Sequence, residues 1–134
     1  MAFSFGPRSL FKLVGVHPDL IKVMKRAIVI SPIDMTVLEG KRTVKQQIKN
    51  VANGVSQTMD SYHIPYKRNG LAHAVDIVPL INGKVTYAWP VYYKLAKVIK
   101  QAAKDVGVPV EWGGDWRSFK DGPHWQLPRS KYPK

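Results

Sequence analysis

The chain has 134 residues, 45% hydrophobic and 22% charged, which are ordinary values for a globular protein large enough to keep a core without disulfide bonds. It has no cysteine, which argues against a metal centre built from thiolates, and no apolar run near the ~20 residues that a membrane-spanning helix needs. With 21 Lys and Arg against nine Asp and Glu, the formal charge is +12, which predicts a polyanionic partner.

The first predicted helix covers about residues 18–30. Pro18 suits the first turn of a helix, and the apolar residues behind it recur at helical spacing. His17 precedes this segment and is interpreted as a structural lead-in to the helix. A strand near residues 35–39 should follow.

A second helix should begin after Thr43. Thr43 and Gln46 have the spacing of a capping box, and Gly54 can close the helix. This arrangement places Arg42 just before a helix N-terminus.

The second half of the chain predicts the centre of a sheet and the longest helix. Residues 74–78 are interpreted as a central strand, and the apolar spacing over 91–106 predicts a helix ended by Gly107. Residues 108–112 should form another strand, and 121–127 should return to the sheet. The expected fold is α+β, a small and mostly antiparallel sheet with helices packed against it.

Two distant segments carry the side chains of a candidate metal site. Asp121 stands three residues before His124 in a Gly-, Pro- and Trp-rich stretch, while His63 and Asp76 lie upstream. His63, Asp76 and His124 would supply three ligands to one Zn²⁺ per chain, leaving a position for a water whose pKa falls towards ~7. Asp121 would be the general base that takes a proton from this water.

Each of these residues also has an ordinary structural interpretation. A buried Asp76 can cap a turn or pair with an arginine, because buried charges need partners. His63 and His124 can be loop and sheet-edge residues. His73 could compete with His63, but residues three apart in a strand point to opposite faces, so His73 and Asp76 should not share a metal.

These residues resemble the motif of the zinc-dependent D-Ala-D-Ala carboxypeptidase and L-alanyl-D-glutamate peptidase family, in particular its small phage endolysins. The motif consists of Ser-x-His, Ala-x-Asp and Asp/Glu-x-x-His, which correspond here to Ser61–His63, Ala74–Asp76 and Asp121–His124. The resemblance also includes Gly40–Thr43 with Gln46, and it runs through nearly the whole chain.

The chain departs from the common pattern at the first ligand. In the family the first histidine stands seven positions before the aspartate, a place that Asn69 occupies here, whereas His63 stands thirteen before it. Residues 64–72 contain the turn formers Pro65 and Asn69-Gly70, so we interpret them as a longer loop between the ligands. His63 is the predicted first ligand, with Asn69 and His73 as the alternatives.

The resemblance implies a hedgehog/DD-peptidase-like fold and hydrolysis of an amide in the peptide stem of bacterial peptidoglycan. It also implies that Arg42 holds the carbonyl oxygen as negative charge builds on it. The alternative is that Arg42 only neutralises a neighbouring acid at a helix start. The predicted substrate-binding residues are Ser61, Gln46, Trp112 and Trp116, although tryptophans in a short chain are more often core.

The resemblance further implies an endolysin of one peptidase domain, residues 1–134, without a separate wall-binding domain. The N-terminus lacks the basic start and apolar stretch of a secretory signal. We therefore expect a monomer that is made in the host cytoplasm and acts on the wall after the membrane is permeabilised.

Three other functions stay open. A D,D-carboxypeptidase acting on terminal D-Ala would use the same metal centre, and a basic non-catalytic protein could bind the wall or nucleic acid. The basic residues are spread along the chain and no nucleic-acid-binding motif is visible, so nucleic acid is not the expected partner. An L-alanyl-D-glutamate endopeptidase is favoured because of the small size and the similarity to phage endolysins.

Overall fold

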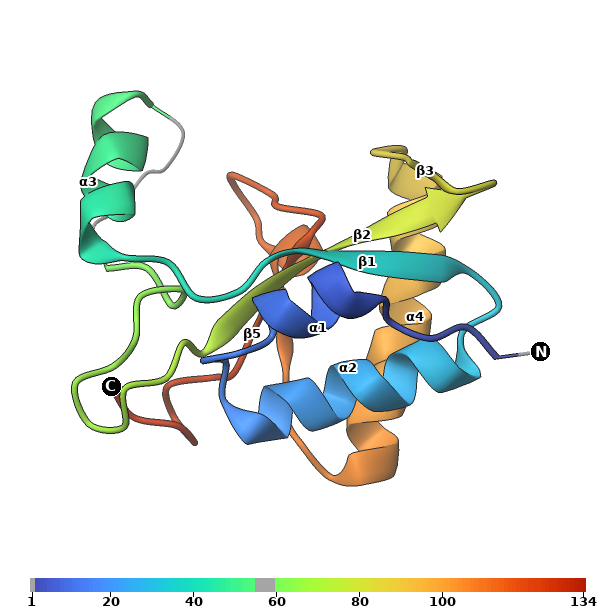
Figure 1. Ribbon diagram of the computed structural model, residues 1–134, viewed down its shortest axis with the longest axis horizontal. Helices are drawn as coiled ribbons and strands as arrows, with labels where there is room; N and C mark the ends of the chain where they lie inside the picture. The colour runs from blue at the N-terminus through green and yellow to red at the C-terminus, as the bar shows by residue number, and fades with distance from the viewer. Residues whose placement is uncertain (1, 55–59) are drawn as a thin grey trace.

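A computed structural model describes residues 2–54 and 60–134 of the chain (Figure 1). In chain order these residues form α1 (Pro7–Lys12), α2 (Pro18–Ile30), β1 (Asp34–Glu39), α3 (Val44–Ala52), β2 (Ala74–Ile81), β3 (Lys84–Val85), α4 (Trp89–Val106), β4 (Glu111–Trp112), the short 3-10 helix η1 (Gly113–Asp115) and β5 (His124–Gln126). No helix among them is both long and apolar enough to cross a bilayer.

The five strands form one antiparallel sheet in the order β1-β2-β5-β4, with β3 paired to the end of β2. β2 is the central strand, and its side chains alternate between the two faces. Val75 and Ile77 are fully buried in the hydrophobic core. Asp76 lies between them and therefore points to the opposite face.

Helices α2 and α4 pack against each other, and α4 also contacts β2 (Figure 1). Each of the two helices is amphipathic and buries one apolar face. On α2 this face is formed by Leu20, Val23, Met24, Ala27 and Ile28, and on α4 by Tyr92, Leu95, Ala96, Ile99, Ala102 and Ala103. The core thus lies on one side of the sheet, which leaves the other side for polar groups. The predicted α+β class is confirmed.

The ends of the predicted helices agree with the structure except at the start of α4. The Nδ1 atom of His17 accepts a hydrogen bond from the backbone N–H of Asp19 at 3.0 Å, so His17 caps α2 and has the structural role predicted for it. Thr43 and Gln46 form both halves of the capping box of α3. α4 begins at Trp89, two residues earlier than predicted, because Pro90 in its first turn is compatible with a helix start.

Three elements differ from the sequence prediction. α1 was not predicted, since its six residues are too few for a clear helical period. β4 is limited to Glu111–Trp112 instead of residues 108–112, because Pro109 has no N–H to donate to a sheet. β2 continues beyond Val78 into a hairpin with β3, whose turn residues Asn82 and Gly83 both have positive φ.

Gly107 ends α4 in the left-handed conformation, with φ at +71°, and a Cβ atom there would meet only open space. Gly107→Ala should therefore lower the free energy of unfolding by about 1 kcal/mol through backbone strain alone. Gly107→Asn should cost less, because asparagine tolerates this conformation. Chemical denaturation of the three proteins measures the difference, and equal losses for Ala and Asn would contradict this account.

Candidate active site

Three side chains with metal-binding atoms meet on the polar face of the sheet. Asp76 on β2 and His124 on β5 are direct partners in the antiparallel register, so their side chains lie on the same face. His63 joins them from the loop before β2. The Oδ1 atom of Asp76 lies 3.2 Å from Nε2 of His63 and 3.4 Å from Nδ1 of His124. All three ligand atoms are within 4.8 Å of one another, which is close enough to share one ion.

Hydrogen bonds on the outer side of each imidazole fix its orientation. Nδ1 of His63 lies 2.7 Å from the backbone oxygen of Gly40, and Nε2 of His124 lies 2.7 Å from Oε1 of Gln126. A carbonyl oxygen only accepts, so the proton of each ring is on this outer nitrogen. The inner nitrogens therefore present lone pairs toward Asp76, as metal-binding histidines do.

Two of the three inner atoms lack a hydrogen-bond partner among the described residues. Nε2 of His63 and Oδ1 of Asp76 are buried without a hydrogen bond in the described structure. A buried unsatisfied polar atom costs about 1–3 kcal/mol. Two nitrogen lone pairs and a carboxylate oxygen facing one point are all acceptors, so a cation satisfies all three. The residues present fit a divalent metal.

The two alternative first ligands lie elsewhere. The ring of His73 stacks on Tyr66, with centroids 3.9 Å apart, and its Nε2 accepts a hydrogen bond from Nδ2 of Asn69 at 3.0 Å. Burial lowers the pKa of His73 to about 4, so this ring is neutral. The fold therefore brings His63, and neither Asn69 nor His73, to the carboxylate of Asp76.

His63, Asp76 and His124 line a cleft of about 750 Å³ together with Asp121 and Arg42. The backbone N–H of Asp121 donates to the oxygen of Gly113 at 3.1 Å. This close approach requires a glycine, because a Cβ atom on residue 113 would lie 2.4 Å from the oxygen of Asp121. Burial, and next the charge of Asp76, raise the pKa of Asp121. A carboxylate with a raised pKa is a better proton acceptor, which suits a base.

The guanidinium of Arg42 is held in the cleft wall by several side chains. Its Nε and Nη2 atoms donate to the two carboxylate oxygens of Glu39 at 2.7 and 2.8 Å, which raises the pKa of Arg42. Its Nη1 atom donates to Oε1 of Gln47 at 2.5 Å and to Oγ of Ser61 at 3.4 Å. Arg42 thus pairs with a neighbouring acid, as the alternative interpretation held, and also faces the cleft.

The remaining predicted substrate-binding residues divide into two groups. Ser61 and Trp116 line the cleft, and the ring of Trp116 lies 5.2 Å from that of His124. Trp112 is only 3% exposed, stacks on Trp125 and donates from Nε1 to the oxygen of Gly122. The side chain of Gln46 caps α3. The positions of Trp112 and Gln46 do not support contact with a substrate.

The residues that support the site were not predicted from the sequence. Gln126 holds His124, and its own Nε2 atom donates to Oε1 of Glu111 at 3.0 Å. Glu39 and Gln47 orient Arg42. Glu39 and Gln47 lie three residues before and five after Arg42, and Gln126 lies two residues after His124 on the same strand, so these partners are close in sequence. The contact of Gln126 with Glu111, 15 residues away, depends on the pairing of β4 with β5.

The chain matches known peptidases over most of its length. The family model described as phage L-alanyl-D-glutamate peptidase matches residues 1–126. The chain is 37% identical over 134 residues to the L-alanyl-D-glutamate peptidase of Escherichia phage T5, covering 98% of this chain and 94% of the relative. It is 41% identical over 95 residues to the L-alanyl-D-glutamate peptidase of Listeria phage A118, covering 71% of this chain and 31% of that protein.

A solved structure shares the fold. The crystal structure of the Serratia marcescens L-Ala D-Glu endopeptidase ChiX superposes with a TM-score of 0.87 at 39% identity, covering 98% of this chain and 95% of that one. The family match extends over nearly all of the chain and includes each cluster residue. The chain belongs to the phage L-alanyl-D-glutamate peptidase family.

Proposed function

We propose that this protein is a zinc-dependent endopeptidase that hydrolyses the amide bond between L-alanine and D-glutamate in the peptide stem of bacterial peptidoglycan. One observation carries the proposal. His63, Asp76 and His124 direct ligand atoms to one point at the cleft that also contains Asp121 and Arg42, and the atoms of His63 and Asp76 are buried without a hydrogen bond in the part of the chain that the structure describes. The peptidase relatives in the phages give the substrate class.

Zinc fits the donor set best. Two imidazoles and one carboxylate are the ligands of many catalytic zinc sites, and three protein ligands leave a coordination position open. When bound, the ion lowers the pKa of a coordinated water and so supplies a nucleophile at neutral pH. Gln126 and the backbone of Gly40 keep the two imidazoles in the required tautomers.

Asp121 and Arg42 act on different groups during the reaction. The carboxylate of Asp121 accepts a proton from the attacking water and passes it to the nitrogen of the leaving D-glutamyl residue as the carbon–nitrogen bond breaks. Arg42, fixed by Glu39 and Gln47, stabilises the carbonyl oxygen as negative charge develops there. Because Glu39 orients this guanidinium in advance, little reorganisation is needed during the reaction.

The biological setting follows from the same proposal. As a phage endolysin the protein would act as a monomer on the cell wall after the membrane is permeabilised. Its formal charge of +12 would concentrate it at the anionic wall. A D,D-carboxypeptidase is the second candidate because it would use the same metal centre, but the relatives named above favour the endopeptidase.

Digestion of purified peptidoglycan tests the proposed bond. The zinc-loaded protein should release peptides that begin with D-glutamate and leave wall fragments that end in L-alanine, as read by mass spectrometry. Chelation should stop the release, and added Zn²⁺ should restore it. Free D-alanine as the product would instead identify a D,D-carboxypeptidase.

The first ligand is tested by a matched pair of variants. His63→Ala should weaken Zn²⁺ binding by more than about 100-fold, since loss of a mere supporting partner already costs 10–100-fold. Asn69→Ala should retain one zinc ion per chain, because Asn69 faces His73. Chelator competition measures both affinities. Zinc loss in Asn69→Ala with retention in His63→Ala would reverse the assignment.

The base is tested by removing its charge. Asp121→Asn should keep full zinc content and lower kcat by about 10²–10⁴-fold, the usual contribution of a general base. Metal analysis and peptide hydrolysis are measured on the same preparation. A parallel fall of metal content and activity would assign Asp121 to metal binding instead.

A further inference from the structure

A second hollow of about 540 Å³ adjoins the cleft. The two share Asp60 and Ser61 in their walls, so they are neighbouring hollows on either side of these two residues. The other walls come mainly from the loop before β2, through Ile64, Pro65 and Lys67 among others. This loop is the segment in which the chain departs from the common family spacing, and it lies beside the C-terminus in Figure 1.

The hollow has an excess of positive charge. Lys67 and Arg68 are exposed in its wall, and among residues 2–54 and 60–134 no carboxylate is within ion-pair distance of either. The nearby acid, Asp60, is bound bidentately by Arg129 at 2.6 and 2.8 Å and by Lys134 at 2.5 Å. These contacts hold the pKa of Asp60 well below its ordinary value, so it stays ionised and paired.

The loop that carries these cations is firmly held. Tyr66, which is 2% exposed, accepts a hydrogen bond from Gly70 on its backbone oxygen at 2.7 Å and donates its own N–H to Leu71 at 3.0 Å. Gly70 has a φ of +68°, as this tight turn requires. The hydroxyl of Tyr66 accepts a hydrogen bond from Arg129 at 3.0 Å. Lys67 and Arg68 therefore extend from a fixed turn.

We propose that this hollow is a subsite for the acidic half of the stem peptide, with Lys67 and Arg68 binding the free carboxylate of its D-glutamyl residue. The inference rests on the proposed function. A glutamate joined to alanine through its amine has two carboxyl groups, and at most one continues the chain. The remaining carboxylate is the complement of two unpaired cations, while Ile64 and Pro65 offer apolar contact to the adjoining aliphatic carbons.

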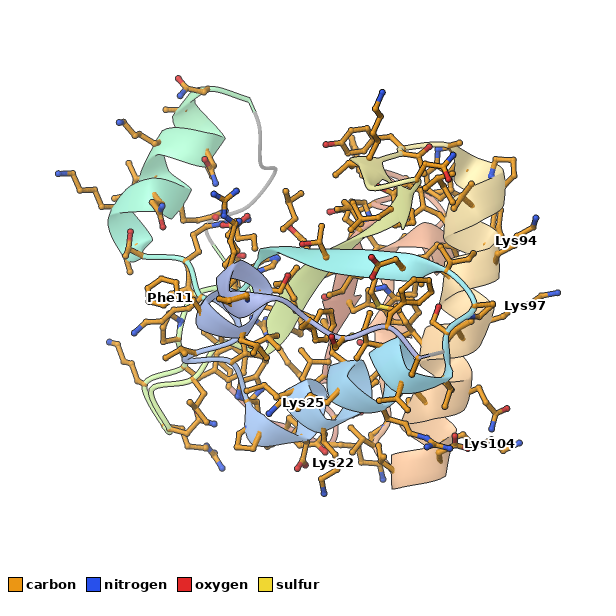
Figure 2. All side chains as sticks on the ribbon, turned by 45° about the vertical axis from the view of Figure 1, so that its right-hand side comes forward. Phe11, Lys22, Lys25, Lys94, Lys97 and Lys104 are labelled. Carbon is orange, nitrogen blue, oxygen red and sulfur yellow. The ribbon has the colours of Figure 1, made fainter. Side chains whose placement is uncertain are left out.

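Positive charge alone does not define this subsite. Figure 2 shows Lys94 and Lys97 projecting from α4 into solvent, and neither lines the cleft or the hollow. Lys94→Ala/Lys97→Ala therefore also removes two positive charges, but leaves the subsite unchanged. It is the matched control for Lys67→Ala/Arg68→Ala.

The kinetic test compares a peptide containing L-Ala-D-Glu with its analogue in which the free carboxylate is an amide. Lys67→Ala/Arg68→Ala should raise KM for the acidic peptide by about tenfold, with kcat little changed, as expected for two solvent-exposed charge contacts. KM for the amidated peptide should not change. The charge-conserving swap Lys67→Arg/Arg68→Lys and the α4 control should behave as the unchanged protein.

A binding measurement separates this inference from the proposed function. The product peptide that begins with D-glutamate is titrated calorimetrically into the intact protein, which requires no catalysis. It should bind the unchanged protein about tenfold more tightly than Lys67→Ala/Arg68→Ala, and high salt should remove the difference. The proposed subsite is overturned if the product peptide binds the unchanged protein and Lys67→Ala/Arg68→Ala equally well. It is also overturned if KM is the same for the acidic and the amidated peptide in all variants. If the protein cleaves no peptide but the difference in binding between the unchanged protein and Lys67→Ala/Arg68→Ala persists, only the proposed endopeptidase function is overturned.

Discussion

The site depends on the antiparallel register between β2 and β5. This pairing sets Asp76 directly opposite His124, on the face of the sheet that the core helices leave free. A shift of one residue would turn Asp76 into the core and place Val75 or Ile77 on the polar face. Since Val75 and Ile77 are fully buried, the hydrophobic effect that holds β2 against the helices also fixes the position of the carboxylate. The packing that stabilises the core thus also sets the geometry of the site.

Supporting hydrogen bonds make the cluster suited to a cation. If the two imidazoles carried their protons on the inner nitrogens, both could donate to Asp76 and the site would be satisfied without an ion. Gly40 and Gln126 prevent this by accepting from the outer nitrogens, so the inner lone pairs stay unmatched. Glu39 plays a comparable part for Arg42. Two buried atoms without a hydrogen bond to any described residue, Nε2 of His63 and Oδ1 of Asp76, therefore face each other at the point where a cation would satisfy both.

The long loop between His63 and Asp76 is irregular, yet hydrogen bonds fix the positions of its two ends. The backbone N–H of His73 donates to Tyr62 at 2.8 Å, and that of Arg42 donates to His63 at 2.8 Å, so both ends of the segment are tied to the fold. From the C-terminal side, the guanidinium of Arg129 stacks over Tyr62 at 4.1 Å. Residues 67–70 of the loop are therefore exposed, the loop forms part of the wall of the second hollow, and His63 stays in the site.

The sequence by itself determined the features that depend on neighbours along the chain. Helical spacing and caps located α2, α3 and α4, an acid within an apolar run located Asp76 on a buried strand, and the pairing of Asp121 with His124 indicated the chemistry. Only the tertiary structure decided between His63, Asn69 and His73, placed Trp116 in the cleft and Trp112 in the core, and revealed the contact of His63 with the backbone of Gly40. Local patterns reflect periodicity and backbone hydrogen bonding, which a few residues specify. Contacts across the sheet depend on register and on the path of a loop, which the packing of the whole chain fixes.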